Sequence, residues 1–274
     1  MTSVAEVIGV LEGMFPPALA EEWDVVGLTV GDPAREVTRT HFAVDPTLAV
    51  VKEAAAAGAQ LLVTHHPLMV RGVTNVAATT AKGAVVHALI EAGIALFTAH
   101  TNADAAHGGV SAALARALGL DSPLPLIPHS TDPSIGTGRV GTVAPTTLKE
   151  LAAALAAALP ATAQGVLYAG DPAAPVRRVA VVGGAGDAYI DAAAASGADA
   201  FVTADLRHHP ALEARELAAV RDGRPALVNV SHAASESLWL ADCARAVAQA
   251  TGVDVHVSTL NTDPWTGHIA SPRP

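Results

Sequence analysis

Short runs of apolar residues alternate along the chain with longer segments in which apolar residues recur every three or four positions. The short runs predict buried strands, and the longer segments predict amphipathic helices. This alternation is typical of an α/β protein whose parallel strands are joined by right-handed crossovers. The predicted strands cover residues 41–44, 61–63, 94–97, 139–143, 165–169, 179–182, 197–203 and a run from 227 that ends near His232. The predicted helices cover residues 4–11, 46–57, 81–92, 110–118, 147–159, 189–195 and about 231–250.

Two local features refine this pattern. Asp45 as N-cap and Pro46 at the first helical position predict the start of the second helix, and Gly58 predicts its end. Residues 151–170 carry no charge and are long enough to raise the question of a membrane span. A proline, a glutamine and a majority of alanines favour instead a soluble helix followed by a strand.

A repeat divides the chain. Residues 58–64 and 197–203 share the pattern Gly-Ala-x-x-(apolar)-Val-Thr. This indicates an internal duplication, with two similar α/β lobes that face each other across a cleft. Residues 121–138 contain four prolines and two glycines, so they are the predicted boundary. The expected lobes are residues 1–122 and 123–274, with a metal site in the cleft.

Composition narrows the class of protein. With 51% hydrophobic and 15% charged residues, the 274-residue chain is globular. A formal net charge of −10 argues against nucleic acid or an anionic membrane as the partner. The single cysteine excludes an internal disulfide framework and a cysteine-based zinc site. No signal peptide is visible at the N-terminus, so a cytoplasmic protein is expected.

Histidines and carboxylates gather directly after three predicted strands, where open α/β sheets bind their ligands. His65 and His66 come first, and Pro67 restricts the backbone of His66. Since adjacent residues of a strand point to opposite sides, both rings can face one site only where the chain leaves strand geometry. The other two groups each pair a histidine with a carboxylate four residues later, namely His100 with Asp104 and His232 with Glu236.

These groups also have plainer interpretations. Adjacent histidines are common in surface loops, and Asp104 is placed to cap the helix near Gly108. His232 and Glu236 have the spacing of an ordinary helix pair. Three such groups at successive strand ends nevertheless favour a shared site. Imidazole and carboxylate together suit Zn, Fe, Mn, Ni or Co. Five ligands exceed the need of one tetrahedral zinc, and two ions about 3.5–4 Å apart with a bridging water fit better and favour hydrolysis.

Two other features leave alternatives open. Residues 183–186, Gly-Gly-Ala-Gly, resemble a phosphate-binding turn, but the pattern favours a tight turn from strand to helix. His208 and His209 in the second lobe are candidates for acid–base groups or phosphate binders, and they are equally compatible with an exposed position.

The motifs together resemble a known family, the Nif-three-like dinuclear-metal-centre proteins, also described as GTP cyclohydrolase I type 2 homologues. The motifs that carry the resemblance are His65-His66-Pro67, His100-Thr101-Asn102-x-Asp104 with Gly108-Gly109, His232-x-x-Ser235-Glu236, Trp23-Asp24-x-Val26-Gly27-Leu28 and Gly183-Gly184-Ala185-Gly186. The resemblance implies a two-lobed α/β fold, a two-metal site and a ring-shaped homohexamer. The ligands that it implies are His65, His66, Asp104, His232 and Glu236, with His100 close by. Val25 departs from the family's usual Asn, and the chain has no room for the domain that longer members insert.

The resulting hypothesis is a hydrolase that uses two divalent ions to act on a nucleotide-like or other phosphate-bearing small molecule. A metal-bridging water is the expected nucleophile, with His100 or His208 as proton carrier. The alternative is a non-catalytic metal-binding protein with an assembly or regulatory role. Neither the substrate nor the native metal follows from the sequence.

Overall fold

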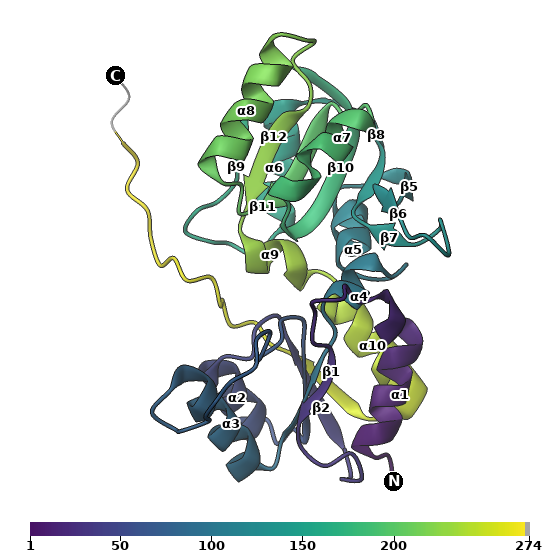
Figure 1. The fold of residues 1–274 in the computed structure, drawn as a ribbon, viewed down its shortest axis with the longest axis vertical. Helices are drawn as coiled ribbons and strands as arrows, with labels where there is room; N and C mark the ends of the chain where they lie inside the picture. The colour runs from purple at the N-terminus through teal and green to yellow at the C-terminus, as the bar shows by residue number, and fades with distance from the viewer. Residues whose placement is uncertain (272–274) are drawn as a thin grey trace. The chain divides into compact units, whose positions relative to one another are not determined.

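The computed structural model describes residues 1–271, and it divides into two compact units (Figure 1). Unit 1 comprises residues 1–109 and 239–262. Unit 2 comprises residues 110–238 and the described residues from 263 onward. Each unit places helices around a mixed sheet, so the predicted α/β fold class is confirmed.

Unit 1 is built on a five-stranded sheet in the order β1-β4-β3-β2-β13, in which only β1 runs antiparallel to its neighbour. Its strands are β1 (Gly27–Val30), β2 (Arg39–Ala43), β3 (Leu61–Thr64), β4 (Ala95–Thr98) and β13 (Asp254–Val257). Its helices are α1 (Val4–Met14), η1 (Pro17–Leu19), α2 (Leu48–Ala56), α3 (Ala81–Ala92), α4 (Thr101–Ala105) and α10 (Leu240–Thr251). Val50 of α2 and Leu89 of α3 share a buried core with Leu62 of β3, while α10 packs against α1 and β2.

Unit 2 is built on a six-stranded sheet in the order β5-β8-β10-β11-β12-β9. The three adjacent strands β10, β11 and β12 are parallel, and antiparallel strands flank them. The strands of unit 2 are β5 (Asp121–Leu124), β6 (Ile127–Pro128), β7 (Gly136–Thr137), β8 (Arg139–Thr147), β9 (Leu167–Ala169), β10 (Pro175–Ala185), β11 (Ala200–Ala204) and β12 (Ala226–Val230). Its helices are α5 (Val110–Ala117), α6 (Leu148–Ala158), η2 (Asp187–Tyr189), α7 (Ile190–Ala195), α8 (His208–Ala219) and α9 (His232–Ser237).

The two sheets share a strand order. In unit 1 an antiparallel edge strand is followed by β4, β3 and β2, and in unit 2 an antiparallel edge strand is followed by β12, β11 and β10. Each triplet is parallel and is joined by helices in the same succession. This correspondence is consistent with the predicted duplication.

The division of the chain differs from the predicted lobes. The chain leaves unit 1 at Gly109 and returns to it at Trp239, because β13 pairs in parallel with β2. Residues 121–138, the predicted boundary, lie inside unit 2, where Pro123 sits in the edge strand β5. An edge strand accepts proline because one side of it makes no sheet hydrogen bonds. The last three residues of the predicted second lobe, 272–274, lie outside the described residues.

One predicted helix is divided differently, and one predicted helix–strand segment agrees with the structure. The single helix expected over about 231–250 is two helices, α9 and α10, which belong to different units. The uncharged residues 151–170 contribute to α6 and β9, as expected for a helix followed by a strand. In the described part of the chain no helix has the length and apolar character needed to cross a bilayer.

Candidate metal centre

The adjacent histidines lie just beyond the end of β3. The strand stops at Thr64, whose hydroxyl donates a 2.9 Å hydrogen bond to the carbonyl of His66 and closes a bend. The ring centroids of His65 and His66 are 5.1 Å apart. The chain therefore leaves strand geometry where Pro67 predicts, and both imidazoles reach one region.

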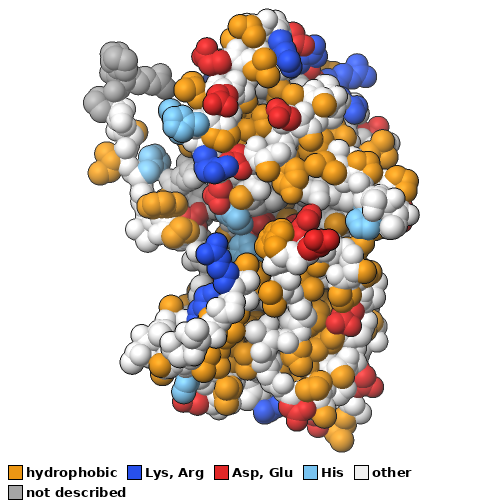
Figure 2. Space-filling view, in the orientation of Figure 1, with side chains coloured by type: hydrophobic (Ala, Val, Ile, Leu, Met, Phe, Trp, Pro, Cys, Tyr) orange, Lys and Arg blue, Asp and Glu red, His pale blue; other side chains and the backbone are white. Residues whose placement is uncertain are grey.

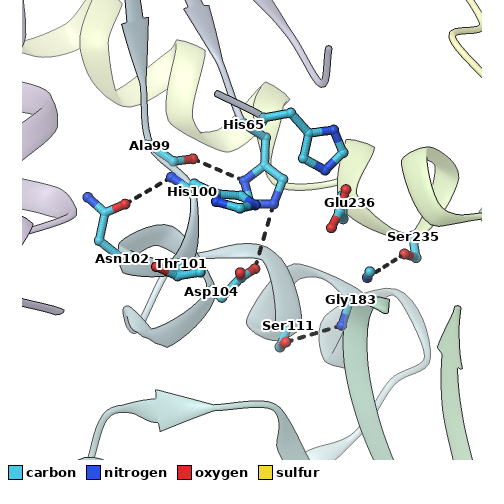
Figure 3. A network of polar contacts seen from close by, with 12 residues as sticks. His65, Ala99, His100, Thr101, Asn102, Asp104, Ser111, Gly183, Ser235 and Glu236 are labelled. Atoms are coloured by element: carbon cyan, nitrogen blue, oxygen red, sulfur yellow. Dashed lines mark hydrogen bonds and ion pairs between the residues drawn. The ribbon is translucent and has the colours of Figure 1, made fainter. Parts of the chain in front are cut away.

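His100 joins them from the neighbouring strand. It lies two residues beyond β4, which pairs in parallel with β3, so the carboxyl ends of both strands are at the same edge of the sheet. Donor atoms of His65, His66 and His100 all lie within 4.8 Å of one another. The Asp104 carboxylate, one turn of α4 further on, lies 3.8 Å from Nε2 of His65 (Figure 3). These four residues are the unit 1 donor set.

Each histidine of this set is held at the ring nitrogen Nδ1. His65 Nδ1 donates to the carbonyl of Ala99 at 3.0 Å (Figure 3). His66 Nδ1 lies 2.7 Å from the Asp45 carboxylate, and His100 Nδ1 lies 2.9 Å from the Asp24 carboxylate. Carbonyl and carboxylate oxygens only accept hydrogen bonds, so Nδ1 carries the proton in each ring. The lone pair is then on Nε2, and this is how metal-binding histidines are usually oriented.

Asp24 is an anchor of the loop that carries His100. Its side chain is fully buried and accepts hydrogen bonds from the His100 ring and from both the backbone and the hydroxyl of Thr101. Burial raises the pKa of the Asp24 carboxyl, but these hydrogen bonds outweigh burial and hold the pKa well below its usual value. The ring of the exposed neighbour Trp23 lies edge-on to the His100 ring, with ring centroids 5.9 Å apart.

Asp45 has a different role from the one predicted. The N-cap of α2 is Thr47, whose hydroxyl accepts a hydrogen bond from the backbone of Val50. The Asp45 carboxylate instead holds His66 and accepts a 2.5 Å hydrogen bond from Thr262. The N-cap prediction is therefore wrong, since a carboxylate two residues past the end of β2 is already engaged by the histidine after β3.

Unit 2 contributes a histidine–carboxylate pair. Ser231 is the N-cap of α9, so His232 and Glu236 lie one turn apart, with Nε2 and Oε1 at 3.1 Å. Glu236 is 3% exposed. His232 Nδ1 lies 2.7 Å from the Asp205 carboxylate, so its proton is placed as in the unit 1 histidines. Asp205 follows β11 and has a positive φ of 52°, a conformation that Asp tolerates better than most residues.

The glycine-rich residues 183–186 lie against this pair. The predicted tight turn from strand to helix is confined to Gly186, because β10 continues to Ala185 and the short helix η2 begins at Asp187. Gly184 has a φ of 70°, and a Cβ there would be 2.2 Å from Glu236 Oε1 and 3.2 Å from His232 Nε2. Its backbone donates to the Ser235 hydroxyl, while that of Gly183 donates to Ser111 (Figure 3). The missing side chain is what leaves room beside the two donors.

His208 and His209 are exposed at the start of α8, with ring centroids 5.1 Å apart. Among the residues that the structure describes, neither belongs to a cluster of metal-binding donors. The sequence reasoning did not assign Asp24 or Asp205 a role beside the histidines. Both Asp45 and Asp205 follow buried strands within two residues, so the strand-end rule that found the histidines could also have found them.

The donor chemistry of the two sets suits divalent ions. The described sets contain imidazole nitrogens with fixed protonation and carboxylate oxygens, and no thiolate, which suits zinc or a neighbouring transition metal. The class of protein that this fold and these donors define is an α/β protein with side chains that could hold metal ions at its strand ends.

The comparisons with known proteins name its family. Residues 2–264 match the model of the family described as Duf34/NIF3 (NGG1p interacting factor 3). A Streptomyces coelicolor protein named "GTP cyclohydrolase 1 type 2 homolog" is 51% identical over 99% of this chain and 96% of its own length. The chain therefore belongs to the DUF34/NIF3 family, as the sequence motifs predict.

Solved structures of similar proteins have the same fold as this chain. A hypothetical protein of Staphylococcus aureus is 29% identical, with a TM-score of 0.87 over 96% of this chain and 98% of its own. A Bacillus cereus protein related to NIF3 has a TM-score of 0.88 at 24% identity, over 97% of this chain and 99% of its own, and so shows the shared fold.

Proposed function

We propose that this protein is a metal-dependent hydrolase that binds two divalent ions. The ligands are His65, His66 and Asp104 of unit 1 with His232 and Glu236 of unit 2. One observation carries the proposal: in His65, His66, His100 and His232 a carbonyl or carboxylate oxygen holds Nδ1, which is how histidines that bind a metal through Nε2 are usually oriented. Histidines in a surface loop or in an ordinary helix pair have no need of an acceptor at Nδ1, and here four histidines have one.

Two bound ions supply Lewis acidity, which polarises a substrate oxygen and makes a water nucleophilic near neutral pH. The chain's own residues do the remaining work. Asp24, Asp45 and Asp205 fix the orientation and protonation of the histidines that they hold. His100 and the exposed His208 are the proposed proton carriers, since imidazole is the side chain that most often serves in general acid–base catalysis.

The substrate that we propose is a nucleotide-like or other phosphate-bearing small molecule. The name of the Streptomyces coelicolor relative refers to a GTP cyclohydrolase, which supports a nucleotide-like compound. Phosphate oxygens are also good ligands for paired divalent ions. Since the chain has a net charge of −10, we expect an anionic substrate to be bound by the metal ions and not by basic side chains.

The test is turnover of a panel of esters, phosphoesters and nucleotides by metal-loaded wild type, with Glu236→Ala as the matched inactive variant. The expected result is hydrolysis of at least one phosphate-bearing compound by wild type alone. If the wild type holds its metal and turns over none of the panel, the hydrolase assignment fails, and a metal-binding assembly or regulatory role replaces it.

Self-association in a homohexamer is a further part of the proposal. Unit 2 exposes large apolar side chains on its edge strand β9, on α8 and at the C-cap of α8, namely Leu167, Tyr168, Leu212, Leu217 and Val220. Figure 2 shows exposed hydrophobic side chains among acidic and basic ones. Light scattering after gel filtration should give six times the mass of the chain, and a monomer would contradict this part.

A further inference from the structure

A second cluster of metal-binding side chains lies in unit 1, apart from the donor set described above. His41 of β2, Glu53 of α2 and His256 of β13 have donor atoms that all lie within 4.8 Å of one another. His41 Nε2 lies 3.0 Å from Glu53 Oε2, and the two imidazole rings stack at 4.8 Å with 29° between their planes. We call these three residues the β13 cluster.

The pairing of the sheet creates this cluster. β13 lies parallel to β2 in a register that sets His256 directly opposite His41, so both side chains point to the same face. Two residues earlier in that register, Arg39 and Asp254 lie opposite each other and form a 3.1 Å ion pair. The positive charge nearest the cluster along β2 is thus already balanced, and it does not repel a bound cation.

The burial and hydrogen bonds of the cluster also suit a metal. His41 is fully buried beside Glu53, and a bound ion would take the place of the proton that lies between His41 Nε2 and the Glu53 carboxylate. The Ser258 hydroxyl donates to Glu53 Oε2 at 2.5 Å and fixes its direction. His256 is the exposed member of the three, so solvent reaches it most easily.

We propose that His41, Glu53 and His256 form an additional binding site for a divalent transition metal ion, independent of the dinuclear site. Two histidines and one glutamate are a donor set found in zinc sites that keep one position open. Imidazole ligands favour zinc, nickel, cobalt or copper over magnesium and calcium. Binding joins β13, at the edge of the sheet, to β2 and α2.

The β13 cluster should bind metal with lower affinity than the dinuclear site. In His65, His66, His100 and His232 the second ring nitrogen is held by an acceptor. By contrast, Nδ1 of His41 is buried and has no hydrogen-bond partner among the described residues. Such outer partners are typically worth 10–100-fold in metal affinity, so the β13 cluster should release its ion first.

The experiment is a titration of chelator-treated protein with zinc chloride in competition with a metal-sensitive dye. Wild type should show one weak equivalent per chain in addition to its tighter ones. His256→Ala should lower the zinc affinity of the weak site by more than about 100-fold, which is more than the loss of an outer hydrogen-bond partner causes. The affinity of the tight sites should be unchanged. His87→Ala, which removes another exposed histidine of unit 1, should leave every equivalent in place.

Two further measurements separate the outcomes. Glu236→Ala should lose tight zinc and keep the weak equivalent, so failure of the dinuclear site leaves this proposal standing. Zinc at the weak site should slow amide hydrogen exchange in β13 and at Ser258 directly after it, whose backbone N–H donates a hydrogen bond to the carbonyl of Phe42. Equal zinc binding by wild type and His256→Ala would overturn the proposal, and the cluster would be a hydrogen-bonded tie between β13 and α2.

Discussion

The carboxylate of Asp205 lies 2.7 Å from Nδ1 of His232, and Asp205 adopts a positive φ of 52° at the end of β11. This backbone conformation is costly for a residue other than glycine, and here it sets a carboxylate behind the imidazole. A carboxylate also lies against the Nδ1 atom of His100, supplied by Asp24, and against that of His66, supplied by Asp45. The candidate centre is thus defined as much by the groups behind the histidines as by the histidines themselves.

The first prediction concerns Asp205. Replacing it with Ala removes the acceptor that fixes the His232 ring, so the affinity for metal should fall by roughly 10–100-fold. Metal titration of the purified variant measures this. The control is Asp191→Ala, an exposed aspartate on α7 of the same unit, which should bind metal as the wild type does. Equal affinity in both variants would show that Asp205 does not orient His232.

The second prediction concerns Gly184. An alanine there would bring Cβ within 2.2 Å of Glu236 Oε1, so the carboxylate must move and metal binding should weaken. Gly197→Ala is a matched control, since Gly197 has a similar φ of 75° and open space around its Cβ position. Both variants carry the strain of about 1–2 kcal/mol for a positive φ, but only Gly184→Ala should lose metal. Equal metal content would contradict the account.

The third prediction is a pH dependence. The pKa of Asp24 is lower in the folded state than its unfolded value of about 3.9. Its contribution to stability is therefore present above that value and is lost as the pH falls through the folded pKa. In metal-free protein, the loss of unfolding free energy caused by Asp24→Asn should be largest near pH 7 and shrink below about pH 4. Urea unfolding of wild type and Asp24→Asn at a series of pH values measures this difference in unfolding free energy. A difference that does not change with pH would contradict the prediction.

Thr101→Val provides a graded version of that test. It removes one of the donors to the Asp24 carboxylate and leaves the His100 contact in place. The pH-dependent part of the stability should therefore shrink without disappearing. A larger effect from Thr101→Val than from Asp24→Asn would show that the threonine acts by another route.

The fourth prediction separates the two adjacent histidines of α8. If His208 carries a proton in the reaction, His208→Ala should lower kcat about 100-fold or more while metal content stays at the wild-type level. His209→Ala removes the neighbouring exposed imidazole and should leave kcat unchanged. Equal effects of the two variants on kcat would remove His208 from the mechanism.

The sequence predicts the local parts of this fold well. The helix over 81–92 and the strands around residues 61–63 and 94–97 are found within a residue or so, because caps and apolar runs are properties of neighbouring residues. The bend after Thr64 also follows from local chemistry, since Pro67 restricts the residue before it.

The errors arise where distant segments meet. The local pattern does not predict the strand 254–257, because what makes it a strand is its pairing with β2, about two hundred residues earlier. The sequence predicts Asp45 as a helix cap because its partner His66 is remote in sequence. Residues 183–184 read as a turn because nothing local shows that their backbone lies against Glu236. The placement of the metal site in a cleft between lobes stays a prediction.

The most direct measurement is metal content per chain, by elemental analysis of wild type and Glu236→Ala. Both are purified without chelator and dialysed at low free metal, so that the weaker β13 cluster is emptied. The account predicts about two equivalents in wild type and a sharp fall in the variant. Near zero in both, even after reloading with zinc, manganese or iron, would mean that the histidines have a structural role, and the hydrolase proposal would fail with the metal site.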